Sequence, residues 1–304
     1  MKYLRNIIPA IVALLGLTLS SYSQVLLDDT WADGSRTETS LPTESAVWAG
    51  TPGNVTMGTG SLLYTQSGSS EKLWTYFTPD GSPVSLGVGE QLIATIDFTP
   101  RTALYDNSSR SFRVGLFHDP TDPQVAEDVN SDGGGGTAPW TDSTGYGVQI
   151  ALSTGATNST SANVGKRTDQ SNSSLMGSSG AWTFDGGGND IVNTLDTLYT
   201  ITLTLDRTTV DQMDFTFTIS DSGGVISTHS ITDDPNGAAA FGTNSIATDF
   251  DQLFFRFSNN TTTADGIDFS RFMVEYVPVP EPSTLALGGL AAFGLIASRR
   301  RLRR

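Results

Sequence analysis

The chain has 304 residues, no cysteine and a formal net charge of -15, from 17 basic and 32 acidic residues. The lack of cysteine excludes disulfide scaffolds, thiolate metal sites and cysteine nucleophiles, and the negative charge argues against a nucleic-acid partner. Hydrophobic residues make up 37% of the chain, enough for the core of one large or two small domains.

The N-terminal segment 1–23 has the organisation of a secretory signal peptide. Lys2 and Arg5 precede an apolar run from Ile7 to Leu19, and small serines follow that run. A short positive region, an apolar run too short to span a bilayer comfortably and small residues before a cleavage point are typical of this signal. We therefore expect an N-terminal signal helix that is removed on export; a buried core helix is the alternative.

The segment 24–277 alternates apolar and polar residues again and again, a pattern typical of half-buried β-strands. In 198–206, for example, Ile201, Leu203 and Leu205 fall on one face, and threonines fall on the other. The same pattern predicts strands at residues 62–65, 73–77, 92–98, 111–117, 146–152, 198–206, 213–219, 225–231, 252–258 and 268–276.

These strands are joined by loops rich in Gly, Ser and Asn, and the three from 198 to 231 are spaced to pair as a meander. One open sheet of ten strands would expose a large apolar face, so two packed sheets are expected. We predict an all-β domain over 24–277, a two-sheet β-sandwich of jelly-roll type. In element order it resembles concanavalin A-like lectin and laminin-G domains, a resemblance of architecture that rests on no motif.

Long connections are where a function is expected, because loops of this length in compact domains are usually functional or disordered. They are predicted at 119–145, 153–180 and 232–249. The first contains Asp128, Asn130 and Asp132 at the alternate spacing of the first half of a calcium-binding EF-hand loop. The second half does not match, because Pro139 stands where the bidentate glutamate would be. A Ca²⁺ clip and an ordinary Asx-rich loop therefore both stay open.

Aromatic residues at loop ends are candidates for carbohydrate binding, because a sugar ring offers an apolar face on which Trp or Tyr can stack. Trp140, Tyr146 and Trp182 have neighbouring Asp and Asn residues that can bond to sugar hydroxyls. We consider these three the candidate glycan-binding residues, with core packing as the alternative. Trp31, Trp48 and Trp74 are expected to pack in the core or against hairpins.

Catalytic patterns are sparse in this segment. Glycoside hydrolysis usually needs two carboxylates at a set separation, and no strand carries a pair of glutamates. An aspartate pair such as Asp249 and Asp251 is the alternative for catalysis, and a solvated strand start is the favoured explanation of these two. His118 and His229 are the only histidines, which excludes a three-histidine metal site, and we expect both to be structural. The sequence therefore predicts no enzyme and no required cofactor.

Residues 278–304 form a third segment. Three prolines hold the backbone extended, and an apolar stretch, 284–297, follows them. As a helix this stretch would be about 21 Å long, against a hydrocarbon core of about 30 Å. A transmembrane helix of that length needs help from its flanks. Arginines, which do not cross a bilayer cheaply, end the chain and are expected to stay cytoplasmic: Arg299, Arg300, Arg301, Arg303 and Arg304.

Pro280-Glu281-Pro282, the Gly- and Ala-rich apolar stretch and the arginine cluster, in this order, resemble the PEP-CTERM protein-sorting signal. The resemblance covers only the last 27 or so residues. It implies that Pro280, Glu281 and Pro282 are recognised by exosortase, a membrane-embedded processing enzyme of Gram-negative bacteria that make exopolysaccharide. It also implies a transient anchor in the inner membrane; a permanent single-span anchor is the alternative.

Removal of both ends would leave 10 basic and 31 acidic residues in 24–277, a net charge near -21. Such a surface repels anionic lipid and anionic polysaccharide unless divalent cations bridge them, and neutral glycans remain compatible partners. We expect a non-catalytic protein of the cell envelope or extracellular matrix with weak carbohydrate binding. The alternative is an extracellular carbohydrate-active enzyme, a glycoside hydrolase or lyase, on a jelly-roll scaffold.

Overall fold

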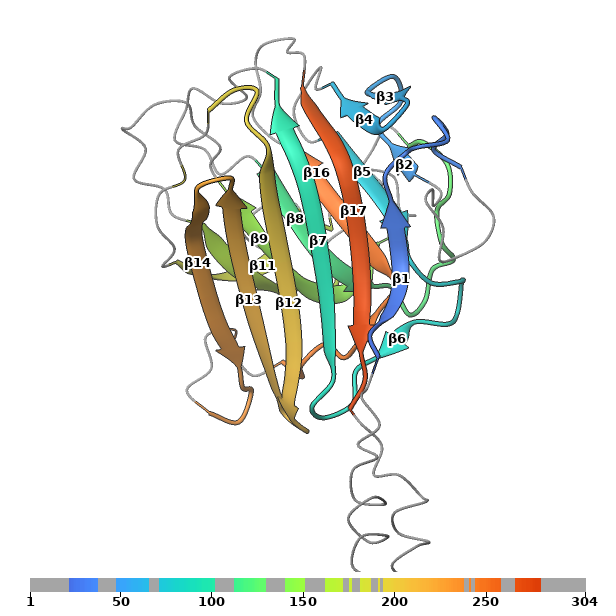
Figure 1. The fold of residues 1–304 in the computed structure, drawn as a ribbon. Helices are drawn as coiled ribbons and strands as arrows, with labels where there is room; N and C mark the ends of the chain where they lie inside the picture. The colour runs from blue at the N-terminus through green and yellow to red at the C-terminus, as the bar shows by residue number, and fades with distance from the viewer. Residues whose placement is uncertain are drawn as a thin grey trace, which may run out of the picture. The chain divides into compact units, whose positions relative to one another are not determined.

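The computed structural model of the chain is drawn in Figure 1. It describes residues 22–37, 48–65, 71–101, 112–129, 140–150, 162–171, 175–176, 181–186, 191, 194–237, 241, 244–257 and 266–279. These residues contain strands and turns and no α-helix. The predicted all-β class is therefore confirmed for this part of the chain.

The strands form two large antiparallel sheets and a small one. The eight-stranded sheet has the order β14 (Gly224–Asp233), β13 (Gln212–Asp221), β12 (Tyr199–Thr209), β7 (Gln91–Pro100), β17 (Ile267–Val277), β4 (Ser61–Tyr64) and β3 (Val55–Gly58), with β1 (Gln24–Asp29) also paired to β17. The seven-stranded sheet has the order β11 (Trp182–Gly186), β10 (Asn163–Arg167), β9 (Thr144–Ile150), β8 (Phe112–His118), β16 (Gln252–Phe257), β5 (Glu71–Tyr76) and β2 (Trp48–Gly50). The small sheet pairs β15 (Asp249–Phe250) with β6 (Val84–Ser85).

The main core lies between the two large sheets, which Figure 1 shows as two layers. The alternation that predicted the strands is the alternation of burial: Ile201, Leu203 and Leu205 on β12 are fully buried, and the residues between them are partly exposed. All ten predicted strands are present, and β12, β13 and β14 pair as the predicted meander. The two-sheet prediction is therefore confirmed.

A second apolar cluster covers the outer face of the seven-stranded sheet. Trp74 on β5 lies opposite Phe254 on β16, and both pack against Trp140. Gly147 on β9 belongs to the same line of cross-strand partners as Trp74 and Phe254. It leaves room for Met176, because a Cβ at this position would lie 2.7 Å from Met176 Cε. The strands of this sheet are thus buried on both faces.

Burial on both faces explains why some strands were not predicted. β10 reads Asn163-Val-Gly-Lys-Arg167, and all five of its residues are buried, so no apolar and polar alternation marks it. It lies inside 153–180, which was predicted to be one long loop, and that prediction is wrong. Other strands outside the predicted set are short or irregular, namely β1, β2, β3, β6, β11 and β15.

Residues Gln24–Tyr276 form one compact unit whose first and last strands pair, with Gln24 opposite Tyr276. The predicted terminal helices, a signal helix in 1–23 and a membrane helix at 284–297, fall almost wholly outside the described residues. Among the residues that are described, no helix is long and apolar enough to cross a bilayer.

Candidate functional site

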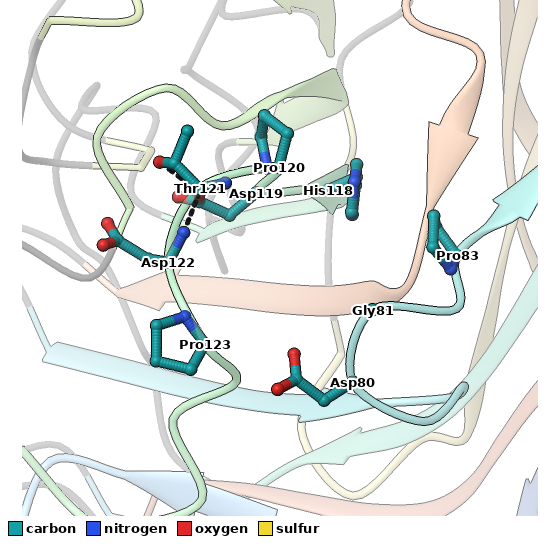
Figure 2. A pocket seen from close by; sticks show the side chains of 9 residues that line it. All are labelled: Asp80, Gly81, Pro83, His118, Asp119, Pro120, Thr121, Asp122 and Pro123. Carbon is teal, nitrogen blue, oxygen red and sulfur yellow. Dashed lines mark hydrogen bonds between the residues drawn. The ribbon is translucent and has the colours of Figure 1, made fainter.

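An open cleft lies where the seven-stranded sheet meets the turn after β5. It has a volume of about 400 Å³ and combines carboxylates, a histidine and three prolines. Figure 2 shows its lining residues: Asp80, Gly81, Pro83, His118, Asp119, Pro120, Thr121, Asp122 and Pro123. We call it the acidic cleft.

Asp119 builds the turn that follows β8. Its Oδ1 accepts hydrogen bonds from the backbone N–H groups of Thr121 and Asp122, each at 3.0 Å, and its Oδ2 accepts one from the Ser143 hydroxyl at 2.8 Å. Pro120 and Pro123 lack the N–H groups that would continue the strand. The Asp119 carboxylate is thus engaged in hydrogen bonds within its own loop. That loop places Thr121 and Asp122 in the lining of the cleft.

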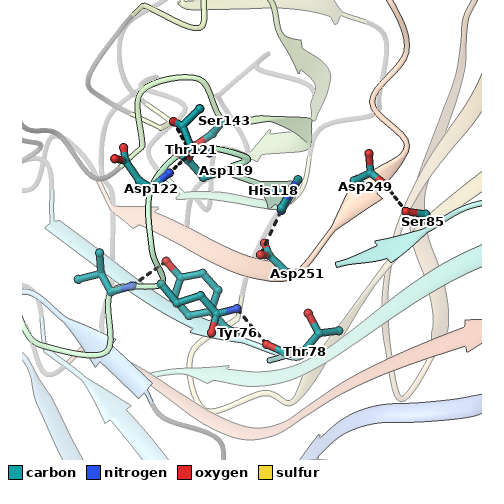
Figure 3. A network of polar contacts seen from close by, with 12 residues as sticks. Tyr76, Thr78, Ser85, His118, Asp119, Thr121, Asp122, Ser143, Asp249 and Asp251 are labelled. Atoms are coloured by element: carbon teal, nitrogen blue, oxygen red, sulfur yellow. Dashed lines mark hydrogen bonds and ion pairs between the residues drawn. The ribbon is translucent and has the colours of Figure 1, made fainter. Parts of the chain in front are cut away.

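His118, the last residue of β8, pairs with Asp251 beside the cleft, as Figure 3 shows. The His118 Nδ1 lies 3.1 Å from Asp251 Oδ2, and the two side chains are only 14% and 5% exposed. The bond to Asp251 raises the pKa of His118 above 6.5, and the charges of Asp249 and Asp119 act in the same direction. The imidazole is therefore held cationic to a higher pH than a free histidine.

Two carboxylates of the cleft stay available to a ligand. Asp80 is exposed, and Asp122 is half-buried, with one 3.4 Å side-chain contact among the described residues, from the Thr141 hydroxyl. Carboxylate oxygens accept hydrogen bonds from hydroxyl groups, and the proline rings offer apolar surface between them. The arrangement suits an uncharged polyhydroxyl ligand.

The cleft does not reproduce a metal site. Within the described residues, no group of three or more His, Asp or Glu side chains is placed to hold a metal ion. Of the predicted calcium ligands, Asp128 is bound by Arg36, whose guanidinium nitrogens lie 3.0 and 2.8 Å from its two oxygens, and by the Gly50 N–H. Asn130 and Asp132 lie outside the described residues, so the Ca²⁺ clip stays a prediction.

The three predicted glycan-binding rings lie inside the protein. Trp140, Tyr146 and Trp182 are at most 4% exposed. Trp140 and Trp182 belong to the cluster on the outer face of the seven-stranded sheet, and Tyr146 lies between the sheets. A buried ring has no face on which a sugar can stack, so these positions do not form the expected surface site. For Tyr146 the sequence held the signal, because it alternates with Val148 and Ile150 on one strand face.

The two aspartates considered as a catalytic pair have different partners. Asp251 faces His118 and is buried, not solvated as expected, whereas Asp249 accepts a hydrogen bond from the Ser85 hydroxyl. His229 lies on β14, and its Nε2 is 3.7 Å from Asp185 Oδ2. The expected core positions of Trp31, Trp48 and Trp74 are confirmed, since each is at most 1% exposed.

Comparison with known proteins identifies the C-terminal segment. The family model described as PEP-CTERM protein-sorting motif matches residues 278–301. The chain therefore carries a PEP-CTERM sorting motif, as its residues predicted. Pro280, Glu281 and Pro282 themselves lie outside the described residues. No curated protein sequence matches the chain.

The solved structures similar to this chain are legume-lectin-like jelly-roll sandwiches. The VIP36 exoplasmic/lumenal domain in its Ca²⁺/Man2-bound form has a TM-score of 0.48 at 10% identity, covering 87% of this chain and 93% of that one. Basic winged bean lectin with Tn-antigen has a TM-score of 0.46 at 10% identity, with 85% and 100% covered. Peanut lectin with a 9mer peptide has a TM-score of 0.42 at 12% identity, with 76% and 91% covered.

Proposed function

We propose that the chain is an exported, non-catalytic protein of the cell envelope or extracellular matrix, sorted and processed by an exosortase. The observation that carries this proposal is the sorting motif at 278–301. In this proposal the signal 1–23 directs export, and the apolar stretch 284–297 with its arginines holds the chain in the inner membrane. Exosortase recognises Pro280-Glu281-Pro282 and releases the sandwich domain 24–277.

The sandwich domain would meet polysaccharide outside the cell, and its charge limits which kind. Its described basic side chains are all engaged: Arg36, Arg101 and Arg271 pair with carboxylates, Lys72, Lys166, Arg167 and Arg256 are buried, and Arg113 and Arg207 donate to backbone carbonyls. Little cationic surface is therefore offered to a polyanion. We propose that the acidic cleft binds a neutral glycan through its hydroxyl groups.

The sorting part of the proposal is tested by mass spectrometry of the protein from its own organism, with and without the processing peptidase. We expect a new N-terminus near Gln24 and a new C-terminus near the Pro-Glu-Pro triplet, the latter absent when the peptidase is absent. Replacing all three of Pro280, Glu281 and Pro282 with Ala should have the same effect. A full-length chain in the cytosol, with Met1 and Arg304 intact, would overturn the proposal.

The glycan part is tested on a glycan array with the full chain. Asp122→Asn keeps the shape of the side chain and removes a charged acceptor in the cleft, and Asp211→Asn makes the same change at an exposed turn. Binding of a neutral glycan that only Asp122→Asn weakens would support the cleft. Release of reducing sugar that Asp249→Asn or Asp251→Asn abolishes would favour the enzyme alternative. Calorimetry that shows no Ca²⁺ binding would remove the clip at Asp128, Asn130 and Asp132.

A further inference from the structure

An ion pair is sealed between the two large sheets. Lys166 lies on β10 of the seven-stranded sheet, and Asp233 ends β14 of the eight-stranded sheet. The Lys166 Nζ lies 2.6 Å from Asp233 Oδ2, and the two side chains are 3% and 0% exposed. Burying an ammonium and a carboxylate together is costly, because both lose their hydration. A reaction that removes both charges would be favoured here.

Tyr146 faces the same carboxylate from β9. Its hydroxyl donates to Asp233 Oδ2 at 2.6 Å and accepts from the Ala247 N–H at 3.1 Å. Its ring centroid lies 6.0 Å from the Lys166 Nζ, and the ring is surrounded by other aromatic rings, those of Phe215, Phe241 and Phe250. Burial raises the pKa of Tyr146 well above 10.0, so the hydroxyl stays a donor. Oδ2 is thus held by the Tyr146 hydroxyl and the Lys166 ammonium, next to a group of aromatic rings.

The other carboxylate oxygen, Asp233 Oδ1, has a different environment. Asp233 Oδ1 is buried and has no hydrogen-bond partner among the residues that the structure describes. An ionised carboxylate in an apolar site needs donors on both oxygens, and leaving one unsatisfied carries a full desolvation penalty. An amine attacks a carbonyl carbon only through its lone pair, so a reaction between the two groups begins with transfer of one proton from the ammonium to the carboxylate.

We propose that Lys166 and Asp233 condense to an amide bond that links the two sheets covalently. The lone pair of the neutral Nζ attacks Cγ, and the Nζ–Cγ bond forms. The Cγ–Oδ1 bond breaks, and Oδ1 leaves as water with two of the three protons that the ammonium carried; the third stays on the amide nitrogen. The ion pair minus one water is the amide, so no oxidant or co-reactant is needed.

Tyr146 would act as the catalytic donor of this step. As Nζ attacks, negative charge develops on the carboxyl oxygen that stays, and the Tyr146 hydroxyl is already bonded to Oδ2. Oδ2 then becomes the amide carbonyl oxygen. The unpartnered Oδ1 is the oxygen that leaves.

One member of the pair also borders a cavity. Lys166 lines a cavity of about 460 Å³ together with Thr144, Gln170, Asn244 and Ser245. The Lys166 Nζ also donates to the carbonyl of Asn244, another residue of that lining, at 2.9 Å. The chain has no cysteine, so an amide would give this exported domain the cross-link that a disulfide cannot. A cross-link between distant positions restricts the unfolded chain and so stabilises the fold.

The test is peptide mapping of the purified, folded full chain. The intact protein should be lighter by one water than its sequence, and trypsin should release a branched peptide that joins residues 114–167 to residues 208–256, uncut after Lys166. The branched peptide is decisive, because cyclisation of an aspartate before a glycine, as at Asp185, also removes one water. Recovery of Lys166 and Asp233 only in separate, unmodified peptides would overturn the proposal.

Two variants separate chemistry from packing. Lys166→Arg keeps a positive charge beside Asp233 but is not expected to condense, so it should show the full mass and no branched peptide. Tyr146→Phe keeps the ring and removes the donor, so the cross-linked fraction should rise more slowly after synthesis. A branched peptide that forms at an unchanged rate in Tyr146→Phe would contradict the role of the hydroxyl.

Discussion

Two ion pairs of this domain each join a basic side chain to an aspartate, and they lie in different surroundings. Lys166–Asp233 is closed between the sheets, and its members come from both of them. His118–Asp251 lies beside the acidic cleft, where the histidine is still in reach of solvent. A sealed pair depends on its protein neighbours for every hydrogen bond, whereas a pair at a cleft can exchange protons with water. The first therefore governs how the sheets are held together, and the second how the domain responds to pH.

The largest effect is expected from breaking the sealed pair. Lys166→Met leaves the Asp233 carboxylate buried without its counter-charge and removes the nitrogen of the proposed amide, and the loss of the counter-charge alone should lower the free energy of unfolding by about 3–5 kcal/mol, measured by urea denaturation. Arg271→Met is the matched control, because Arg271 pairs with Asp28 at the surface with side chains 38% and 40% exposed. That change should cost about 1 kcal/mol or less. Equal losses would show that the interior pair is not special.

Removal of a single hydrogen bond should have a smaller effect. Tyr146→Phe keeps the packing against Phe215 and removes the hydroxyl that Asp233 Oδ2 accepts from. A hydrogen bond to a charged group contributes about 1.5–3 kcal/mol, and we expect a loss in that range by urea denaturation in the Lys166→Arg background, where no amide forms and Asp233 stays a carboxylate. Tyr199→Phe, on β12, provides a comparison, because the Tyr199 hydroxyl accepts from the Thr194 backbone N–H instead of donating to a carboxylate. The Tyr146 change should cost more.

The open pair predicts a pH dependence. Folding raises the pKa of His118, so its contribution to stability is fully present below the unfolded value near 6.5 and is lost as pH rises through the higher folded value. The melting temperature should fall over this window in the natural chain, and His118→Gln should remove that part of the fall. An identical profile in the variant would show that His118 does not titrate there.

The smallest effect on stability is expected in the cleft itself. Asp122→Asn alters a half-buried side chain with one long contact, so the free energy of unfolding should change by about 0.5 kcal/mol or less. Glycan affinity should nevertheless fall about tenfold, the size of one hydrogen bond to a charged acceptor. A large loss of stability would place Asp122 in the structure of the loop rather than in binding.

The alternating strands were predictable because each buries one face against the opposite sheet. On β13, Phe215, Phe217 and Ile219 are buried and the residues between them are not, so the sequence carries the period. β10 carries none, because its outer face is buried too. The candidate metal and sugar residues were chosen by residue type, and the type of a residue does not reveal which side chains surround it in the fold. Arg36 is 92 residues from the Asp128 that it binds. Trp140 packs on Trp74.

The sequence by itself determined the sorting motif of the chain and its class of fold. A sorting motif is read as a linear peptide and a strand as a local period, so both are complete in the order of the residues. Only the tertiary structure decided which polar groups meet. Asp251, between β15 and β16, reaches His118 at the end of β8, and Lys166 on β10 reaches Asp233 on β14. Antiparallel register and sheet packing place these distant residues together, and neither leaves a trace in the local pattern.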